Sequence, residues 1–230
     1  ANDTEDLSVI SSFAKDIVQN KLEQELYENI GRLLTYEKEY PFKSKSYYLG
    51  KKLVENGIDI NLLSEKIISF LSKFDGGNSV YLHLDFAKGV YREISETNII
   101  NWYEILDEIK ITTNMHNYFI EFCFLGKVRE ADLTHIIEGI SKGNIDVNNL
   151  RKVIFYILDA QISNSAFSNF IENISAFSIE GKIISIEMSN RYISNNKEIL
   201  TIPKFQSILR SLIFDVPIIG DVRTNFYEWE

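Results

Sequence analysis

Cysteine, proline and alanine are scarce in this chain. Its 230 residues include 1 Cys, 3 Pro and 11 Gly, and we count 7 Ala. A disulfide scaffold needs paired cysteines and is therefore excluded. Low-complexity and collagen-like chains need far more glycine and proline. No apolar run approaches the roughly 20 residues that a membrane-spanning helix requires, so we expect no membrane partner.

Aliphatic and aromatic side chains are abundant instead. Hydrophobic residues make up 45% of the chain, with 34 Ile, 15 Phe and 12 Tyr, which excludes intrinsic disorder. The net charge of −9 disfavours general binding to nucleic acid or anionic membranes. No signal-peptide pattern opens the chain, so we expect a cytoplasmic protein. Because the first residue is Ala, we expect a processed or excised chain, which could be the helical part of a longer protein.

The dominant hydrophobic period is helical. From Leu7 to Leu34 apolar residues recur every three to four positions, which predicts one long helix over 5–38, or two with a bend near Asn20. Pro41 ends the pattern. Further helices are expected at about Ser46–Glu55, 60–74, Val80–Ile94, Asn98–Ile109, Met115–Leu125, Ala131–Ser141, Val147–Gln161, Ser165–Phe177 and Lys204–Asp215.

These elements predict an all-α fold of irregular antiparallel helical hairpins, stacked as a repeat-like array or bundle. We expect one helical domain over 1–230, with a long N-terminal helix in 1–42, hairpins in 45–176 and a C-terminal cap in 177–230. The β-branched segment Phe177–Met188 is compatible with either a small β-hairpin that turns at Glu180-Gly181 or a helix.

Two segments resemble each other. Residues 57–71 align without a gap on residues 144–158, with identities that include Ile58/Ile145, Asp59/Asp146 and Leu63/Leu150. In each case a helix is expected to end, the chain to turn, and an Asp or Asn to cap the next helix. The match has two possible explanations: chance similarity between capped amphipathic helices, or true repetition.

The segment "YYLGKKLVENG", Tyr47 to Gly57, resembles the first half of a tetratricopeptide repeat. The similarity rests on the Leu49-Gly50 pair, on Leu53 and on Gly57. The second half departs from that family, which prefers Ala where this chain has Leu62 and Ser69. The resemblance covers about eleven residues. It implies a helical scaffold with a surface for a peptide or protein, and it implies no chemistry and no functional residues.

Motifs of common cofactor enzymes are not found, because no phosphate loop, dinucleotide fingerprint, HExxH, CxxC or nucleophile elbow occurs. We therefore expect no cofactor and no metal. His135 could share a helical face with Asp132 and Glu138, but further ligands from facing helices are not apparent. On a helix, His83 and Asp85 would point apart. Cys123 lies among aromatic residues, which predicts a buried, unreactive thiol.

The most distinctive segment is Tyr36–Lys52, in which five lysines and two glutamates give a local charge of +3. Its tyrosines could staple two helices together while the lysines keep the surface soluble, or the segment could bind an acidic peptide or single-stranded nucleic acid. The terminal aromatics around Trp229 dock on the last helices or anchor a partner. The candidate binding residues are Tyr36, Lys38, Tyr40, Phe42, Lys43, Lys45, Tyr47, Tyr48, Lys51, Lys52 and Trp229.

The sequence thus favours a non-enzymatic helical scaffold whose partner is another protein or peptide. The first alternative is a nucleic-acid-binding or regulatory domain that uses residues 36–52. The second is an enzyme or metal site of a type without a recognisable motif, centred on His135.

Overall fold

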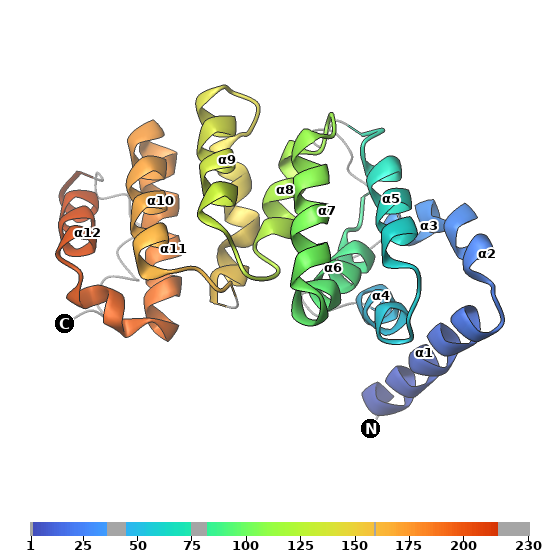
Figure 1. Ribbon diagram of the computed structural model, residues 1–230. Helices are drawn as coiled ribbons and strands as arrows, with labels where there is room; N and C mark the ends of the chain where they lie inside the picture. Colours follow the sequence, from blue (N-terminus) through green and yellow to red (C-terminus); the bar gives the residue numbers. More distant parts are fainter. Residues whose placement is uncertain (1, 36–44, 75–81, 159, 216–230) are drawn as a thin grey trace. The chain divides into compact units, whose positions relative to one another are not determined.

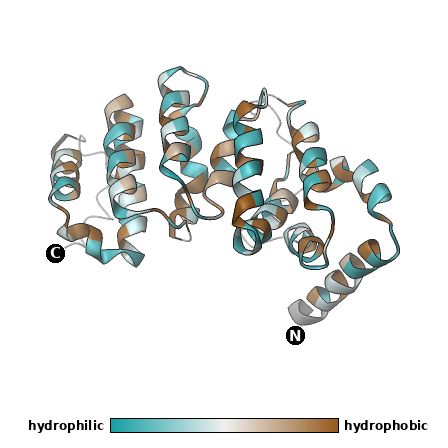
Figure 2. Cartoon of the chain, in the orientation of Figure 1, coloured by the Kyte–Doolittle hydropathy of each residue, from teal (hydrophilic) through white to brown (hydrophobic). Residues whose placement is uncertain are grey.

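The computed structural model describes residues 2–35, 45–74, 82–158 and 160–215, and its fold is all-α (Figure 1). The chain packs as two compact units, Ala1–Leu125 and Gly126–Glu230. The single domain expected from the sequence stays a prediction. The helices carry both apolar and polar residues, as expected for amphipathic helices (Figure 2).

Eight helices of the first unit are described: α1 Asn2–Gln19, α2 Glu23–Glu28, α3 Ile30–Thr35, α4 Lys45–Glu55, α5 Ile60–Leu71, α6 Asp85–Thr97, α7 Ile99–Ile111 and α8 His116–Cys123. The described part of the second unit contains α9 Glu130–Ser141, the 3-10 helix η1 Val147–Leu158, α10 Asn164–Phe177, α11 Ile179–Asn195, the 3-10 turn η2 Lys197–Thr201 and α12 Pro203–Asp215.

The long N-terminal helix predicted over 5–38 is wrong within the described residues. Helix α1 ends at Gln19, where Lys21 adopts a positive φ of 55°, and a second interruption at Asn29 separates α2 from α3. A lysine in the left-handed region cannot continue a right-handed helix. The break expected near Asn20 is therefore confirmed, but the described residues 2–35 form three helices and not the two of that alternative.

The β-hairpin considered for 177–188 is also wrong, because Phe177 ends α10 and residues 179–188 belong to α11. The Ser178 hydroxyl caps the helix by accepting a hydrogen bond from the Gly181 amide at 3.0 Å. Gly181 is not a turn residue. A Cβ at this position would overlap the Ile174 carbonyl oxygen, so glycine here permits the close approach of α10 and α11.

The two similar segments have related local geometry. Gly57 and Gly143 both have positive φ, 85° and 75°. The Asp59 carboxylate accepts a hydrogen bond from the Leu62 amide at 3.0 Å and caps α5, whereas Asp146 accepts one from the Asn148 amide at 2.9 Å. The first turn leads into an α-helix and the second into the 3-10 helix η1. True repetition stays a prediction.

Helix α4 packs most closely on α6, and two glycines make this possible. A Cβ on Gly89 would overlap the carbonyl oxygen of Tyr47, and one on Gly50 would lie 2.9 Å from the Val90 amide nitrogen. Both obstacles are backbone atoms, which cannot move away by a rotamer change. Gly50, part of the Leu49-Gly50 pair that resembles a tetratricopeptide repeat, therefore contacts α6. In the sequence, α5 lies between α4 and α6.

Each unit has its own aromatic core. In the first unit the ring of Tyr91 lies 4.8 Å from that of Phe122 and 5.9 Å from that of Trp102, measured between centroids. All three side chains are fully buried. In the second unit Phe167 and Tyr192 stack with centroids 3.9 Å apart, and Phe205 completes the cluster.

Candidate functional site

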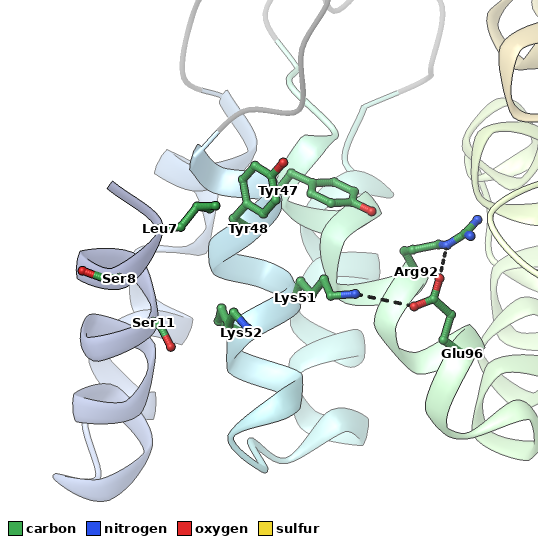
Figure 3. Close-up of a pocket in the computed structure, with 9 residues that line it drawn as sticks. All are labelled: Leu7, Ser8, Ser11, Tyr47, Tyr48, Lys51, Lys52, Arg92 and Glu96. Atoms are coloured by element: carbon green, nitrogen blue, oxygen red, sulfur yellow. Dashed lines mark hydrogen bonds and ion pairs between the residues drawn. The ribbon is translucent and has the colours of Figure 1, made fainter. Parts of the chain in front are cut away.

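A groove lies between α1, α4 and α6 of the first unit, and it contains part of the segment that the sequence singles out (Figure 3). Its volume is about 490 Å³. One wall comes from α1, the floor and centre from α4, and the far edge from α6. The lining residues are Leu7, Ser8, Ser11, Tyr47, Tyr48, Lys51, Lys52, Arg92 and Glu96.

Two adjacent tyrosines form the centre of the groove. Successive residues of an α-helix point about 100° apart, so Tyr47 turns toward the core and is only 8% exposed, whereas Tyr48 remains half-buried. Their rings meet edge to face with centroids 5.6 Å apart. Figure 3 shows Leu7 of α1 pointing toward Tyr48. The groove thus offers an aromatic surface bordered by an aliphatic side chain.

The lysines of α4 lie beside carboxylates. Lys45 pairs with Asp6 of α1 at 2.9 Å, and Lys52 pairs with Glu55 one turn further along α4. Lys51 reaches across to α6, where its Nζ is 2.8 Å from Glu93 and 3.5 Å from Glu96. Acidic residues of other helices therefore compensate the charges of Lys45 and Lys51.

The Lys51–Glu93 pair is the most buried of these contacts, because the Glu93 side chain is only 8% exposed. The hydrogen bond to Glu93 raises the pKa of Lys51, although partial burial of the ammonium group opposes this effect. Removal of one partner would leave a poorly solvated charge beside the α4–α6 contact. The pair therefore links the groove floor to its far edge.

At the far edge, Glu96 accepts a hydrogen bond from Arg92 Nε and forms an ion pair with Lys51. Arg92 also donates from Nη1 to the Leu125 carbonyl oxygen at 2.7 Å. Partial burial of Glu96 would raise its pKa, but the Arg92 hydrogen bond and the charges of Arg92 and Lys51 outweigh burial, so the pKa is lowered from 4.5.

Glu96→Gln is expected to reduce the acid sensitivity of the fold. Because the folded pKa of Glu96 is depressed, its stabilising contribution is present above the unfolded pKa and is lost as the pH falls through the folded value. The difference in unfolding free energy between wild type and variant should therefore shrink from about pH 7 to about pH 3. Urea unfolding at both pH values measures this difference. Glu104→Gln, at an exposed position on α7, is the control for removing a carboxylate. A pH-independent difference between the wild type and Glu96→Gln would contradict the assignment.

The structure brings four of the candidate residues to the groove: Tyr47, Tyr48, Lys51 and Lys52. Lys45 lies on α4 and pairs with α1, but it does not line the groove. The remaining candidates, Tyr36, Lys38, Tyr40, Phe42, Lys43 and Trp229, lie outside the described residues. That any of these residues binds a partner stays a prediction.

Sequence reasoning missed the lining residues contributed by α1 and α6: Leu7, Ser8, Ser11, Arg92 and Glu96. The spacing of Arg92 and Glu96 indicates an ion pair on one helix face, and Ser8 and Ser11 interrupt an apolar pattern. Neither signal indicates that the three segments meet. Their proximity follows from the packing of α1 and α6 on α4.

The structure also places the histidine and cysteine residues considered from the sequence. Within the described ranges, no group of three or more His, Cys, Asp or Glu side chains is arranged to hold a metal ion. Cys123 is fully buried, as expected. The expectation that His83 and Asp85 point apart is wrong, because His83 precedes α6 and its Nε2 lies 3.6 Å from the Asp85 carboxylate.

Comparisons with family models, curated proteins and solved structures give no significant match to this chain. Among the helices that the structure describes, none combines the length and apolar character needed to cross a membrane. The fold is thus all-α. The groove between α1, α4 and α6 is the surface from which a function can be inferred.

Proposed function

We propose that this chain is a helical protein-interaction scaffold, and that the groove between α1, α4 and α6 binds a segment of a partner protein. The observation that carries the proposal is a pair of adjoining tyrosines at the centre of a groove of about 490 Å³. Tyrosine supplies a large contact area and a polar hydroxyl, and it is enriched among residues that dominate binding energy.

The groove volume suits a few side chains of a peptide. Pockets of about 300–1,000 Å³ typically bury most of a small ligand, and they combine apolar walls with a few polar groups. Here Leu7 and the tyrosine rings provide apolar surface, and the Ser11 hydroxyl provides a hydrogen-bonding group. The occupant we propose is a peptide segment with an aromatic or branched aliphatic side chain flanked by hydrogen-bond acceptors.

The helices beneath the groove are closely packed. Close backbone contact at Gly50 and Gly89 holds α4 against α6, and the Lys51–Glu93 pair reinforces that contact. A preorganised surface loses less conformational freedom on binding than a mobile one, which favours affinity. The opposite wall is held differently, since α1 packs on the rest of the unit through buried Ala14 and Ile17 and the exposed Lys45–Asp6 pair.

The two alternative functions lack a comparable observation. Nucleic-acid binding through the α4 lysines would have to compete with their carboxylate partners Asp6, Glu55, Glu93 and Glu96. Counterion release by uncompensated cations supplies most of the affinity for nucleic acid. A metal site at His135 has no set of ligands among the described residues to support it.

Selection of a displayed random-peptide library on the full chain tests the proposal. Enriched peptides should carry an aromatic or aliphatic anchor, and Tyr48→Ala should weaken their binding at least about tenfold in fluorescence anisotropy, because it removes the central contact. Ser11→Trp should block the same peptides by filling the groove without removing an aromatic anchor.

Ile111→Ala is the control, because Ile111 is 84% exposed on α7 and does not line the groove. Thermal melts followed by circular dichroism identify any variant that fails to fold. The proposal is wrong if selection enriches no peptide, or if folded Tyr48→Ala and Ser11→Trp bind the enriched peptides as tightly as the wild type does.

A further inference from the structure

The break between α1 and α2 has an unusual residue at its centre. Helix α1 ends in a Schellman motif, in which the Leu22 amide donates to the Ile17 carbonyl oxygen at 2.9 Å. The Lys21 amide donates to the Val18 carbonyl oxygen at 3.4 Å. This motif requires a left-handed residue, which here is Lys21 with a φ of 55°. The helix therefore ends at a residue type that favours helix continuation.

Helices α4 and α9 end in the same motif, and both use glycine. The left-handed residues are Gly57 and Gly143, and each amide donates to the carbonyl oxygen three residues before it at 3.0 Å. Glycine adopts positive φ without a steric penalty, whereas the lysine Cβ meets the following carbonyl oxygen. The other described non-glycine residue with positive φ is Asn114, and asparagine tolerates this conformation. Lys21 is therefore a strained position.

The local sequence allows α1 and α2 to form one continuous helix. Residues 1–30 contain no glycine or proline, and apolar residues recur at helical spacing from Leu7 to Leu34. In a continuous helix Lys21 would have an ordinary helical φ, and regular hydrogen bonds to the fourth preceding residue would replace the Schellman motif. Tertiary packing of α1 must therefore hold the bent conformation.

This packing is limited. Among the α1 side chains that the structure describes, Ala14 and Ile17 are buried, and the others are at least partly exposed. Helix α4 is shorter and buries five residues. The side chains of the Lys45–Asp6 pair, which joins α1 to α4, are 73% and 51% exposed, and such pairs contribute little to stability. Few contacts thus oppose the release of strain at Lys21, which favours two conformations of similar free energy.

We propose that Lys21 is the hinge of a movable arm. In the bent conformation α1 completes the groove, and in an open conformation α1 continues α2 as one helix. Opening removes Leu7, Ser8 and Ser11 from the groove. Where it concerns the groove, this inference rests on the proposed function: a partner segment that contacts α1 binds the bent conformation and shifts the population toward it. The hinge itself needs no partner.

Double electron–electron resonance on the full chain measures the hinge without a partner. Nitroxide labels are attached to Ser12→Cys on α1 and Glu104→Cys on α7, two exposed positions, while the fully buried Cys123 stays unlabelled. Two distances are expected, one for each conformation. Lys21→Gly relieves the bent backbone and should lower the open fraction at least about threefold. Lys21→Val introduces a β-branched residue, which avoids positive φ, and should raise it at least about threefold.

Asn114→Gly is the matched control, because it places glycine at a positive-φ position outside the hinge, and it should leave the distances unchanged. Thermal melts followed by circular dichroism identify variants that fail to fold. Lys21→Gly fits the bent backbone, so it keeps the test decisive if Lys21→Val does not fold. The same distance distribution in the wild type and in the folded Lys21 variants would overturn the hinge.

Peptides enriched on the groove separate the hinge from the proposed function. They should reduce the open fraction and bind Lys21→Val at least about threefold more weakly than the wild type. If the Lys21 variants shift the distances but no peptide is enriched, the hinge stands and the proposed function fails. If peptides are enriched and the Lys21 variants change neither distance nor affinity, the groove stands and the hinge fails.

Discussion

Replacing Gly89 with alanine is expected to lower the free energy of unfolding of the first unit by about 3 kcal/mol. The added Cβ would overlap the Tyr47 carbonyl oxygen and lie 2.8 Å from the Tyr47 carbonyl carbon. Backbone atoms cannot relieve this overlap by changing rotamer, so α4 and α6 must move apart. The loss should outweigh the gain of about 1 kcal/mol in helix propensity that alanine provides. Urea denaturation measures the change.

Gly31→Ala is the control in the same unit. Its Cβ would approach the ring of Phe70, a side chain that can shift, rather than a backbone group. We therefore expect a loss smaller by at least about 1 kcal/mol. Equal stability of the Gly89→Ala variant and the wild type would show that α4 and α6 are not in backbone contact. Because α4 forms the groove floor and α6 its far edge, Gly89→Ala should also weaken binding of groove peptides.

Phe167→Ala is expected to destabilise the second unit by about 3–5 kcal/mol, the range for deleting a fully buried phenylalanine. Phe167 is fully buried and stacks on Tyr192, with the rings inclined by 11°. The Tyr192 hydroxyl in turn lies 2.7 Å from the Ile162 carbonyl oxygen and 3.0 Å from Asn164 Oδ1. Loss of the stacked ring removes packing on Tyr192 and leaves a cavity between α10, α11 and α12.

Phe155→Ala is the matched control, because Phe155 is 68% exposed, and it should cost less than about 1 kcal/mol. Hydrogen exchange locates the effect. If the two units unfold independently, Phe167→Ala should lower amide protection in 126–230, and Gly89→Ala should lower it in 1–125. A uniform loss in both variants would indicate that the chain unfolds as the single domain expected from its sequence.

Local features of the chain predict most of the described helices. The apolar period places α5, α7, α9 and α10 within a few residues of their observed bounds. End signals also hold, since Asp59 caps α5, Gly57 follows α4 with positive φ, and Pro203 is the first residue of α12. These interactions join residues at most four apart, so they can be inferred without knowing the tertiary structure.

The sequence-based predictions fail where the same local pattern is compatible with two structures. Gly181 suggests a hairpin turn, but in the fold it lets α11 approach the Ile174 carbonyl oxygen of α10. The apolar period continues past Asn20, yet the backbone at Lys21 ends α1. In Val147–Leu158 the same period accommodates a 3-10 helix instead of an α-helix. In each case backbone geometry or a distant contact decides between local alternatives.

The candidate site, too, was predicted from the sequence only in part. The density of tyrosines and lysines in 36–52 indicates an unusual segment from sequence alone, and four of its residues line the groove. The local charge of +3 does not show which lysines are paired: in the described part of the segment, Lys45 and Lys51 pair with Asp6, Glu93 and Glu96, which lie far away in the chain.

The sequence by itself determined that this is an all-α chain with amphipathic helices, because helix formation and capping depend on neighbours within about one turn. Only the tertiary structure decided that Gly50 and Gly89 bring α4 onto α6, that α1 completes a groove, and that Phe155 meets Arg191. Those contacts join residues about 35 or more positions apart. Long-range packing selects them, and the short-range pattern of the chain does not encode which helices will meet.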